Sequence, residues 1–460
     1  MTLLRNTFVL LCGVLVVSFF LSSCVKDAKP STAAVADYDS EVALKWNQMY
    51  LEIERYSPGY RPGPAPRSLA YIGLATYEAC ISGMPDYNSM KSLYPGLEIP
   101  AIDKNAEYHW PTVVNFVYKT MLHKFFPNLT NQQVLDQWAA LENSLEDKYK
   151  ASTNDKVYSV SKDYGITVAE AVWNWSKTDA VGHDAYLDPF GTYDWQAHFD
   201  GPGDWVPTPP GPSKPMFANW GSARTFAILP SDKLCKAPLV YSESQQSALY
   251  AQALEVYNAI HDNNWEDGQW IATFWSDDLV NLTFSPGPRW IAIANQVIEK
   301  ENTDLETSLF CYAKLGLALN DAAVSCWYSK YVYNVERPVS YINRLINPDW
   351  KPTLKNPLTG DSGMTPAFPA FPSGHSTMGG AGAEVLTDVF GNHYGMLDRC
   401  HEGRTEFNGT PRFFDNFYQM AEENAISRVP LGVHWRMDCE VGVDLGYLVG
   451  RRVNNLPWKK

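Results

Sequence analysis

Apolar residues recur at helical spacing along most of this 460-residue chain, and this pattern limits the folds available to it. One such stripe is formed by Leu249, Ala253, Val256, Tyr257 and Ile260. Ser242 and Gln245 are placed as a capping box for that helix. Convincing alternating strands are scarce, so the sequence predicts an all-α fold of helical bundles with long loops rich in Pro and Trp.

Two further helices can be placed from their caps and apolar spacing. Thr303 and Glu306 can cap a long helix that runs to about Tyr331, and Glu440 to Val453 has the pattern of a terminal helix. The 16 Trp and 26 Tyr can supply a large core. The length allows two average domains or one large helical domain, and we expect a single helical domain over residues 39–460. A formal net charge of −14 argues against a nucleic-acid-binding surface.

The segment from Asp188 to Pro230 breaks the helical pattern, because it is rich in Pro, Gly and Trp. A loop of this length is either functional or a linker between domains. Its many aromatic residues favour a loop packed over the core, near the entrance of a site.

The N-terminus reads as an export signal. Arg5 precedes an apolar run from about Thr7 to Leu21, which is too short to cross a bilayer well. Leu21-Ser-Ser-Cys24 resembles the bacterial lipobox, in which the cysteine is lipidated. We therefore expect a signal peptide at 1–23, lipidation of Cys24 and a flexible tether at 24–38, which describes an exported bacterial lipoprotein of the periplasm, outer membrane or cell surface. The lipid would be its sole membrane contact, and an uncleaved anchor is the alternative.

Six cysteines remain beyond that signal: Cys80, Cys235, Cys311, Cys326, Cys400 and Cys439. One or two disulfides are compatible with an exported chain, and buried free thiols are equally compatible.

Three short segments of the C-terminal third carry chemistry. The first runs from Lys330 to Arg337-Pro338, the second is Phe371-Pro-Ser-Gly-His375, and the third runs from Arg428 through His434 to Asp438. If one helix carried both Lys330 and Arg337, two turns apart, they would share a side of it, and Pro338 would end that helix. Ser373 and Gly374 precede a helix that starts near His375, and helix N-termini bind anions. Three cations, a nest of donors and two imidazoles predict a site for a tetrahedral oxyanion.

Each element alone has an ordinary structural explanation. A Lys and an Arg two turns apart are usually on a solvated face, Pro-Ser-Gly is a common turn, and a histidine beside a tryptophan is often a core residue. The ordered combination of all three segments with intact spacing is what makes the prediction specific.

These segments resemble the signature of the superfamily of type 2 phosphatidic acid phosphatases and vanadium haloperoxidases. Phe368-Pro-Ala-Phe-Pro-Ser-Gly-His375 resembles the haloperoxidase form of the middle motif, and Ile271–Asp278 with Ser285–Trp290 resembles the upstream helix and loop of that family. The resemblance covers about residues 243–453, and bacterial vanadium iodoperoxidases are the closest in appearance.

The resemblance implies a role for each matching residue. Those that would hold vanadate, or phosphate in the same site, are Lys330, Arg337, Ser373, Gly374, His375, Arg428 and His434. His434 would bind the vanadium, His375 would move protons and Lys330 would hydrogen-bond hydrogen peroxide. Trp327 and Phe368 would line the halide pocket. Asp278 would brace an arginine, and Asp438 would orient His434.

The residues singled out in the sequence are compatible with three functions. The first is a haloperoxidase that uses hydrogen peroxide to oxidise iodide or bromide to hypohalous acid, which then halogenates small organic acceptors. The second is a vanadate-inhibited acid phosphatase with a phosphohistidine on His434. The third is a non-enzymatic oxyanion-binding lipoprotein of the envelope. Trp327, the lead-in from Phe368 and the soluble-looking body favour the peroxidase.

Overall fold

The computed structural model describes residues 33–260 and 266–460. The predicted signal peptide, Cys24 and the first part of the predicted tether lie outside the described residues. Within the described ranges the chain is built from α-helices, with one hairpin of two short antiparallel strands. The predicted all-α fold is confirmed.

The α-helices are α1 (Glu41–Tyr56), α2 (Pro64–Cys80), α3 (Trp110–Phe125), α4 (Gln132–Ala151), α5 (Asp155–Ser176), α6 (Ala248–Ala259), α7 (Glu266–Phe274), α8 (Pro286–Glu301), α9 (Leu305–Tyr333), α10 (Pro338–Leu345), α11 (Gly374–Phe390), α12 (Phe417–Ile426) and α13 (Arg436–Asn454). The strands are β1 (Met396–Asp398) and β2 (Arg412–Phe414).

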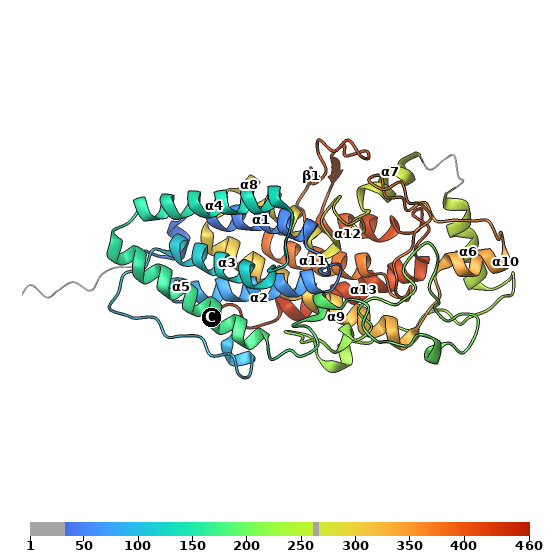
Figure 1. Cartoon of the computed structure of the whole chain (residues 1–460), viewed down its shortest axis with the longest axis horizontal. Coiled ribbons are helices and arrows are strands. Elements are labelled where there is room, and N and C mark those ends of the chain that lie inside the picture. Colours follow the sequence, from blue (N-terminus) through green and yellow to red (C-terminus); the bar gives the residue numbers. More distant parts are fainter. Residues whose placement is uncertain (1–32, 261–265) are drawn as a thin grey trace, which may run out of the picture.

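Two groups of helices lie end to end along the molecule. Figure 1 shows α1 to α5 gathered at one end and α6, α7, α10 and α12 at the other. Helix α9 packs on α2 of the first group and also on α11 and α13. One hydrophobic cluster contains residues from Val35 to Trp458, so a continuous core joins the two groups.

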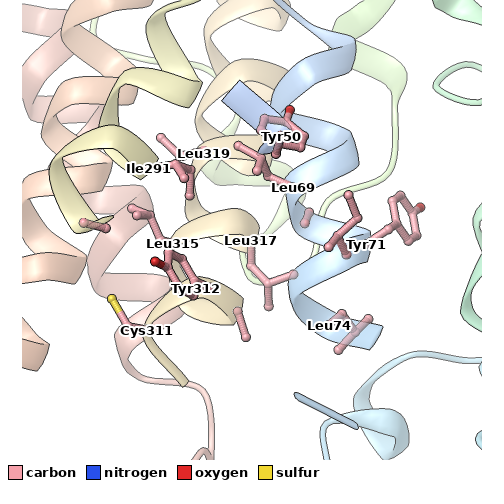
Figure 2. Packing of buried hydrophobic residues seen from close by; sticks show 14 of the residues in the cluster. Tyr50, Leu69, Tyr71, Leu74, Ile291, Cys311, Tyr312, Leu315, Leu317 and Leu319 are labelled. Carbon is pink, nitrogen blue, oxygen red and sulfur yellow. The ribbon is translucent and has the colours of Figure 1, made fainter. Parts of the chain in front are cut away.

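Close packing between α2 and α9 depends on two glycines. A Cβ on Gly73 would lie 2.9 Å from the backbone of Ala313, and one on Gly316 would lie 2.5 Å from the carbonyl oxygen of Leu69. Because no side chain separates the helices there, leucines on either side interdigitate; Figure 2 shows Leu317 reaching from α9 towards α2. This contact fixes the helix that carries Lys330.

Several predicted helix boundaries differ from those of the structure. The helix with the 249–260 stripe is capped by Ser247, whose hydroxyl accepts from the Tyr250 N–H, and not by Ser242. Helix α9 is capped by Asp304, whose carboxylate accepts from the Thr307 N–H at 2.7 Å, and not by Thr303. In both cases another polar residue of a type that caps helices lies at most a few residues earlier in the sequence, which made the wrong cap plausible.

The folded part starts earlier than residue 39. Val35 is fully buried, and the backbone carbonyl of Ala33 accepts a hydrogen bond from the indole of Trp110. Residues 33–38, which the sequence assigned to a flexible tether, therefore belong to the packed structure. All six cysteines of the described chain are free thiols, which is one of the two alternatives that the sequence left open.

The Pro-rich segment from Asp188 to Pro230 packs over the core as a long loop. Trp205 and Trp220 are each 1% exposed, and the backbone of Trp205 donates to the carbonyl of Asn334. The buried carboxylate of Asp321 on α9 accepts from the amides of Phe226, Ala227 and Ile228, which fixes the end of the loop. This arrangement favours the packed-loop interpretation over a linker.

Replacing Asp321 with alanine should lower the free energy of unfolding by about 2 to 4 kcal/mol, because the loop amides lose a buried acceptor. Urea denaturation followed by tryptophan fluorescence measures this. Glu299→Ala, at an exposed position of α8, is the control and should change stability little. Equal stability of both variants would contradict the anchoring role of Asp321.

Candidate functional site

The three predicted segments meet at the junction of α9, α11 and α13. A small inner cavity of about 20 Å³ is lined by residues that include Trp327, Phe368, Gly374, His375, Arg428 and His434. Lys330 and Arg337 lie directly behind this lining, against Phe368 and His434. Asp278 also lines this cavity, although it lies far upstream in the sequence. The structure thus brings together the residues that the sequence singled out.

Lys330 and Arg337 do not share a helix, so the condition under which the sequence would place them on one side of a helix is not met. Helix α9 ends at Tyr333, and Asn334 adopts a left-handed conformation (φ 50°) that closes it. Arg337 is extended, because a residue before proline is excluded from the helical region, and Pro338 begins α10 rather than ending a helix. The turn between them still directs both cations to one cavity.

Lys330 and Arg337 are fully buried cations held mainly by backbone oxygens. The Lys330 ammonium donates to the carbonyls of Pro369 and Ala370, both at 2.8 Å. The Arg337 guanidinium donates to the carbonyls of Phe368 at 3.0 Å and Val433 at 2.8 Å. Neither cation has a carboxylate within ion-pair distance among the described residues.

Burial shifts both cations towards their neutral forms. It lowers the pKa of Lys330 to about 7 and that of Arg337 to about 10. The charge of Arg337 also lowers the pKa of Lys330, and the charge of Arg428 lowers that of Arg337. A buried cation without a counter-ion is costly unless a negative group arrives. The two residues therefore create a strong preference for a bound anion.

Arg428 completes the cationic lining from the opposite side. One of its terminal nitrogens bonds the carboxylate of Asp278 at 2.5 Å, while its Nε has no partner in the described structure. Burial raises the pKa of Asp278, but the charge of Arg428 and its hydrogen bond more than offset this, so the pKa of Asp278 lies below the usual value. Asp278 is therefore an ionised brace that orients the guanidinium.

His434 is held in one tautomer by Asp438. Nδ1 of the imidazole lies 2.8 Å from Oδ2 of the carboxyl, and that oxygen also accepts the Trp435 N–H at 3.1 Å. Because Oδ2 acts as an acceptor, Nδ1 carries the hydrogen and Nε2 keeps its lone pair. Nε2 lies 3.2 Å from a terminal nitrogen of Arg337, at the cavity wall.

Burial also shifts the titration of this pair. It lowers the pKa of His434 well below 6.5, and Arg337 lowers it further. It raises the pKa of Asp438 to about 7, while the charge of Lys330 opposes that rise. The imidazole is therefore neutral, which is the form that can bind a metal centre.

His375 lies on the second residue of α11 and has an unused ring nitrogen. Its Nε2 has no hydrogen-bond partner in the described structure and lies 4.0 Å from the Asp278 carboxylate. Burial lowers the pKa of His375 to about 3, and Arg428 contributes to the shift. A neutral imidazole aimed into a cationic cavity can take up a proton once an anion offsets the surrounding charge.

Ser373 and Gly374 form the start of α11. The Ser373 hydroxyl caps the helix by accepting from the Ser376 N–H, and its backbone N–H donates to the Asp438 carbonyl. Gly374, the first residue of the helix, lines the cavity, where helix N-terminal amides attract negative charge. The predicted start of this helix near His375 is correct to within one residue.

An aromatic corner closes one side of the cavity. The rings of Trp327 and Phe368 lie 4.9 Å apart, and the Lys330 ammonium lies 5.1 Å from the Phe368 ring centre. An apolar surface next to a cation suits a large, polarisable anion. The Trp327 indole is fixed by the carbonyl of Met216 from the Pro-rich loop.

Three buried residues next to this part of the site, Asp277, Arg289 and Asp398, were not predicted from the sequence. Arg289 stacks on Phe274 and Trp275 and forms an ion pair with Asp398 at 2.7 Å. Asp277 is buried beside this group, and burial raises its pKa to about 7. The only sequence signal was the adjacent pair of aspartates, which does not reveal that one faces Arg428 and the other Arg289.

An outer cavity of about 270 Å³, here called the vestibule, adjoins the inner one. The two share Pro62, Asp278, Pro286, Pro366 and Phe368. Val280, which is 55% exposed, also lines the vestibule, so this space reaches the molecular surface. Phe190, Pro212 and Met216 of the Pro-rich loop form part of its wall, which agrees with the predicted position of that loop at an entrance.

The fold and sequence resemble those of known proteins over nearly the whole chain. The profile of the VCPO second helical-bundle domain matches residues 310–457. Vanadium chloroperoxidase of Curvularia inaequalis is 23% identical over 507 aligned residues, covering 89% of this chain and 81% of that protein.

Two solved structures extend the likeness to the N-terminal half. A bacterial vanadium-dependent chloroperoxidase in its holo form shares the fold with a TM-score of 0.64 and 16% identity, covering 91% of this chain and 97% of the other. The first bacterial vanadium-dependent iodoperoxidase to be solved matches with a TM-score of 0.78 and 30% identity, covering 92% of this chain and 98% of that one. With this identity over almost the full length of both chains, the protein belongs to the vanadium-dependent haloperoxidase family.

Proposed function

We propose that this protein is a vanadate-dependent haloperoxidase that oxidises iodide or bromide with hydrogen peroxide. The observation that carries the proposal is the pair of fully buried cations, Lys330 and Arg337, without carboxylate partners among the described residues. Arg337 has an unpartnered terminal nitrogen, and Arg428 has an unpartnered Nε. Such a donor set fits a tetrahedral oxyanion carrying several negative charges.

Different residues of the site would bind vanadate and transfer protons. Lys330, Arg337 and Arg428 would hold the vanadate oxygens together with Ser373 and Gly374, and Nε2 of His434 would bind the vanadium. Vanadate, when bound, supplies a Lewis-acidic centre that activates hydrogen peroxide towards attack by halide. His375 accepts and returns a proton at Nε2, and the narrow inner cavity limits access of bulk water.

The proposed preference for iodide and bromide rests on the surroundings of Trp327, Phe368 and Lys330. Two aromatic rings beside one ammonium group favour a large halide with a weakly held hydration shell, and iodide is also the halide that is easiest to oxidise. We therefore propose that the protein oxidises iodide more efficiently than bromide. Efficient chloride oxidation would overturn this order.

The function is tested by a direct comparison of two activities. Protein without residues 1–24 is stripped in phosphate-free EDTA buffer, and orthovanadate is then added. Peroxide-dependent oxidation of iodide and bromide is measured beside hydrolysis of p-nitrophenyl phosphate. We expect vanadate-dependent halide oxidation. Vanadate-inhibited hydrolysis without halide turnover would instead indicate the phosphatase, and binding without either activity would indicate an oxyanion carrier.

Asp438→Asn should weaken vanadate binding by about 10- to 100-fold, because an amide is a weaker acceptor for the Nδ1–H of His434 than the carboxyl group that orients and polarises this ring. Titration calorimetry of the stripped protein with orthovanadate measures the dissociation constant. The control is Asp444→Asn, at an exposed position of the same helix. An unchanged dissociation constant in the Asp438 variant would exclude its orienting role.

The cellular location is a separate proposal. It rests on the apolar run up to Leu21 and the lipobox-like Leu-Ser-Ser-Cys24. We expect the full chain, expressed in a bacterial host, to incorporate labelled palmitate and to sediment with membranes. Cys24→Ala should abolish the label, and a labelled variant would contradict lipidation at this residue. No helix in the described ranges is both long and apolar enough to cross a membrane.

A further inference from the structure

The methionines of the described chain are unevenly exposed. Eight are buried: Met49, Met84, Met90, Met121, Met378, Met396, Met420 and Met437. The other two, Met216 and Met364, are partly exposed, and both line the vestibule. Within the described residues, methionines that are not buried are therefore found at one place on the molecule.

Backbone contacts hold Met216 at the wall of the vestibule. Its N–H donates to the carbonyl of Ala367 at 2.7 Å, and its carbonyl accepts from the Tyr331 hydroxyl at 2.8 Å. Met364 arrives from the segment before Phe368 on the same wall, and its N–H bonds the Leu354 carbonyl. A product leaving the inner cavity through the vestibule passes these two side chains.

We propose that Met216 and Met364 are modification sites that reduce hypohalous acid as it leaves, becoming methionine sulfoxides. This inference rests on the proposed haloperoxidase function, which supplies the oxidant. The thioether sulfur attacks the halogen, the halogen–oxygen bond breaks, and hydroxide leaves. Water then adds to sulfur and halide departs. The balance is one thioether and one hypohalous acid giving one sulfoxide, one halide and one proton.

Oxidation of these two methionines would protect the buried site, because they consume the oxidant and can afterwards be repaired. Sulfur is oxidised by two electrons, the halide returns to its reduced form, and the sulfoxide can be reduced again by methionine sulfoxide reductases. The first equivalents of oxidant made by each molecule are consumed in the vestibule. Fresh protein should therefore release hypohalous acid only after a delay.

The experiment uses vanadate-loaded protein turning over iodide or bromide with hydrogen peroxide, in the presence of excess free methionine as a bulk trap. Sulfoxide is mapped by peptide mass spectrometry, and halide turnover is recorded in the same reaction. Leu254→Met supplies the matched control, since Leu254 is 37% exposed on α6 and lines neither cavity. We expect sulfoxide at Met216 and Met364 to exceed that at the introduced thioether by about ten-fold.

A double variant tests the predicted lag before hypohalous acid is released. Met216→Leu combined with Met364→Leu should keep the initial rate of peroxide consumption but lose a lag of about two oxidant equivalents per molecule in trap-free reactions. Equal sulfoxide at all three positions, equal sulfoxide without halide, or oxidation confined to Met378 would overturn the inference. Halide turnover without excess sulfoxide overturns this inference alone, whereas absent halide turnover overturns the proposed function and this inference with it.

Discussion

The His434→Ala variant should bind vanadate at least about 100-fold more weakly than the parent protein, since it loses the one side chain placed to bind the metal centre. Nε2 of His434 has a lone pair at the cavity wall, and Asp438 holds the opposite nitrogen. The cations would still attract the anion, so weak binding should remain at high vanadate concentration. Calorimetric titration of stripped protein measures the loss.

His393→Ala is the matched control, because it removes an exposed imidazole far from the cavity and should leave the affinity unchanged. Circular dichroism should show that both variants keep the helical fold. If the His434 variant bound vanadate as tightly as its control, the assignment of His434 as the vanadium ligand would fail.

The His375→Ala variant should lose turnover but largely keep its affinity for vanadate. Turnover of iodide should fall by about 100- to 10,000-fold, because the proton-transferring imidazole is absent. Vanadate affinity should stay within about ten-fold of the parent value, since three cations and His434 remain. Steady-state kinetics at saturating vanadate, compared with calorimetry of the same samples, separates the two quantities.

A loss of vanadate affinity as large as that of the His434 variant would contradict the acid–base role of His375. The two histidines are distinguishable because their surroundings differ. His434 has a carboxyl partner at 2.8 Å, whereas the Nε2 of His375 has only the Asp278 oxygen at 4.0 Å. One ring is fixed for binding, and the other has a free nitrogen in the cavity.

Local patterns in the sequence predicted much of the helical structure. The terminal helix expected at 440–453 is the inner part of α13 (Arg436–Asn454), and the helix expected near His375 is α11. Amphipathic spacing is a local property, so it survives in the fold. Helix caps were less predictable. Ser247 and Asp304 are the observed caps, because several polar side chains near a helix start can act as caps and the sequence alone does not distinguish them.

The sequence predicted the members of the site but not how they are held. The spacing of Lys330, Arg337, His375, Arg428 and His434 indicated an oxyanion site, and the structure gathers these residues around one cavity. The sequence left open whether one helix carries both Lys330 and Arg337, and in the structure they do not share one. The left-handed Asn334 and the extended residue before Pro338 turn the chain, and the cations converge through that turn.

Sequence by itself determined the all-α class, the three chemical segments and the position of the Pro-rich loop outside the helices. Only the tertiary structure decided which side chains face the cavity without a partner. Neither Lys330 nor Arg337 has a carboxylate nearby in the described structure, while Arg428 has Asp278. Such pairings depend on contacts between residues far apart in the chain, and on burial that removes water as a competitor. Neither is encoded in local spacing.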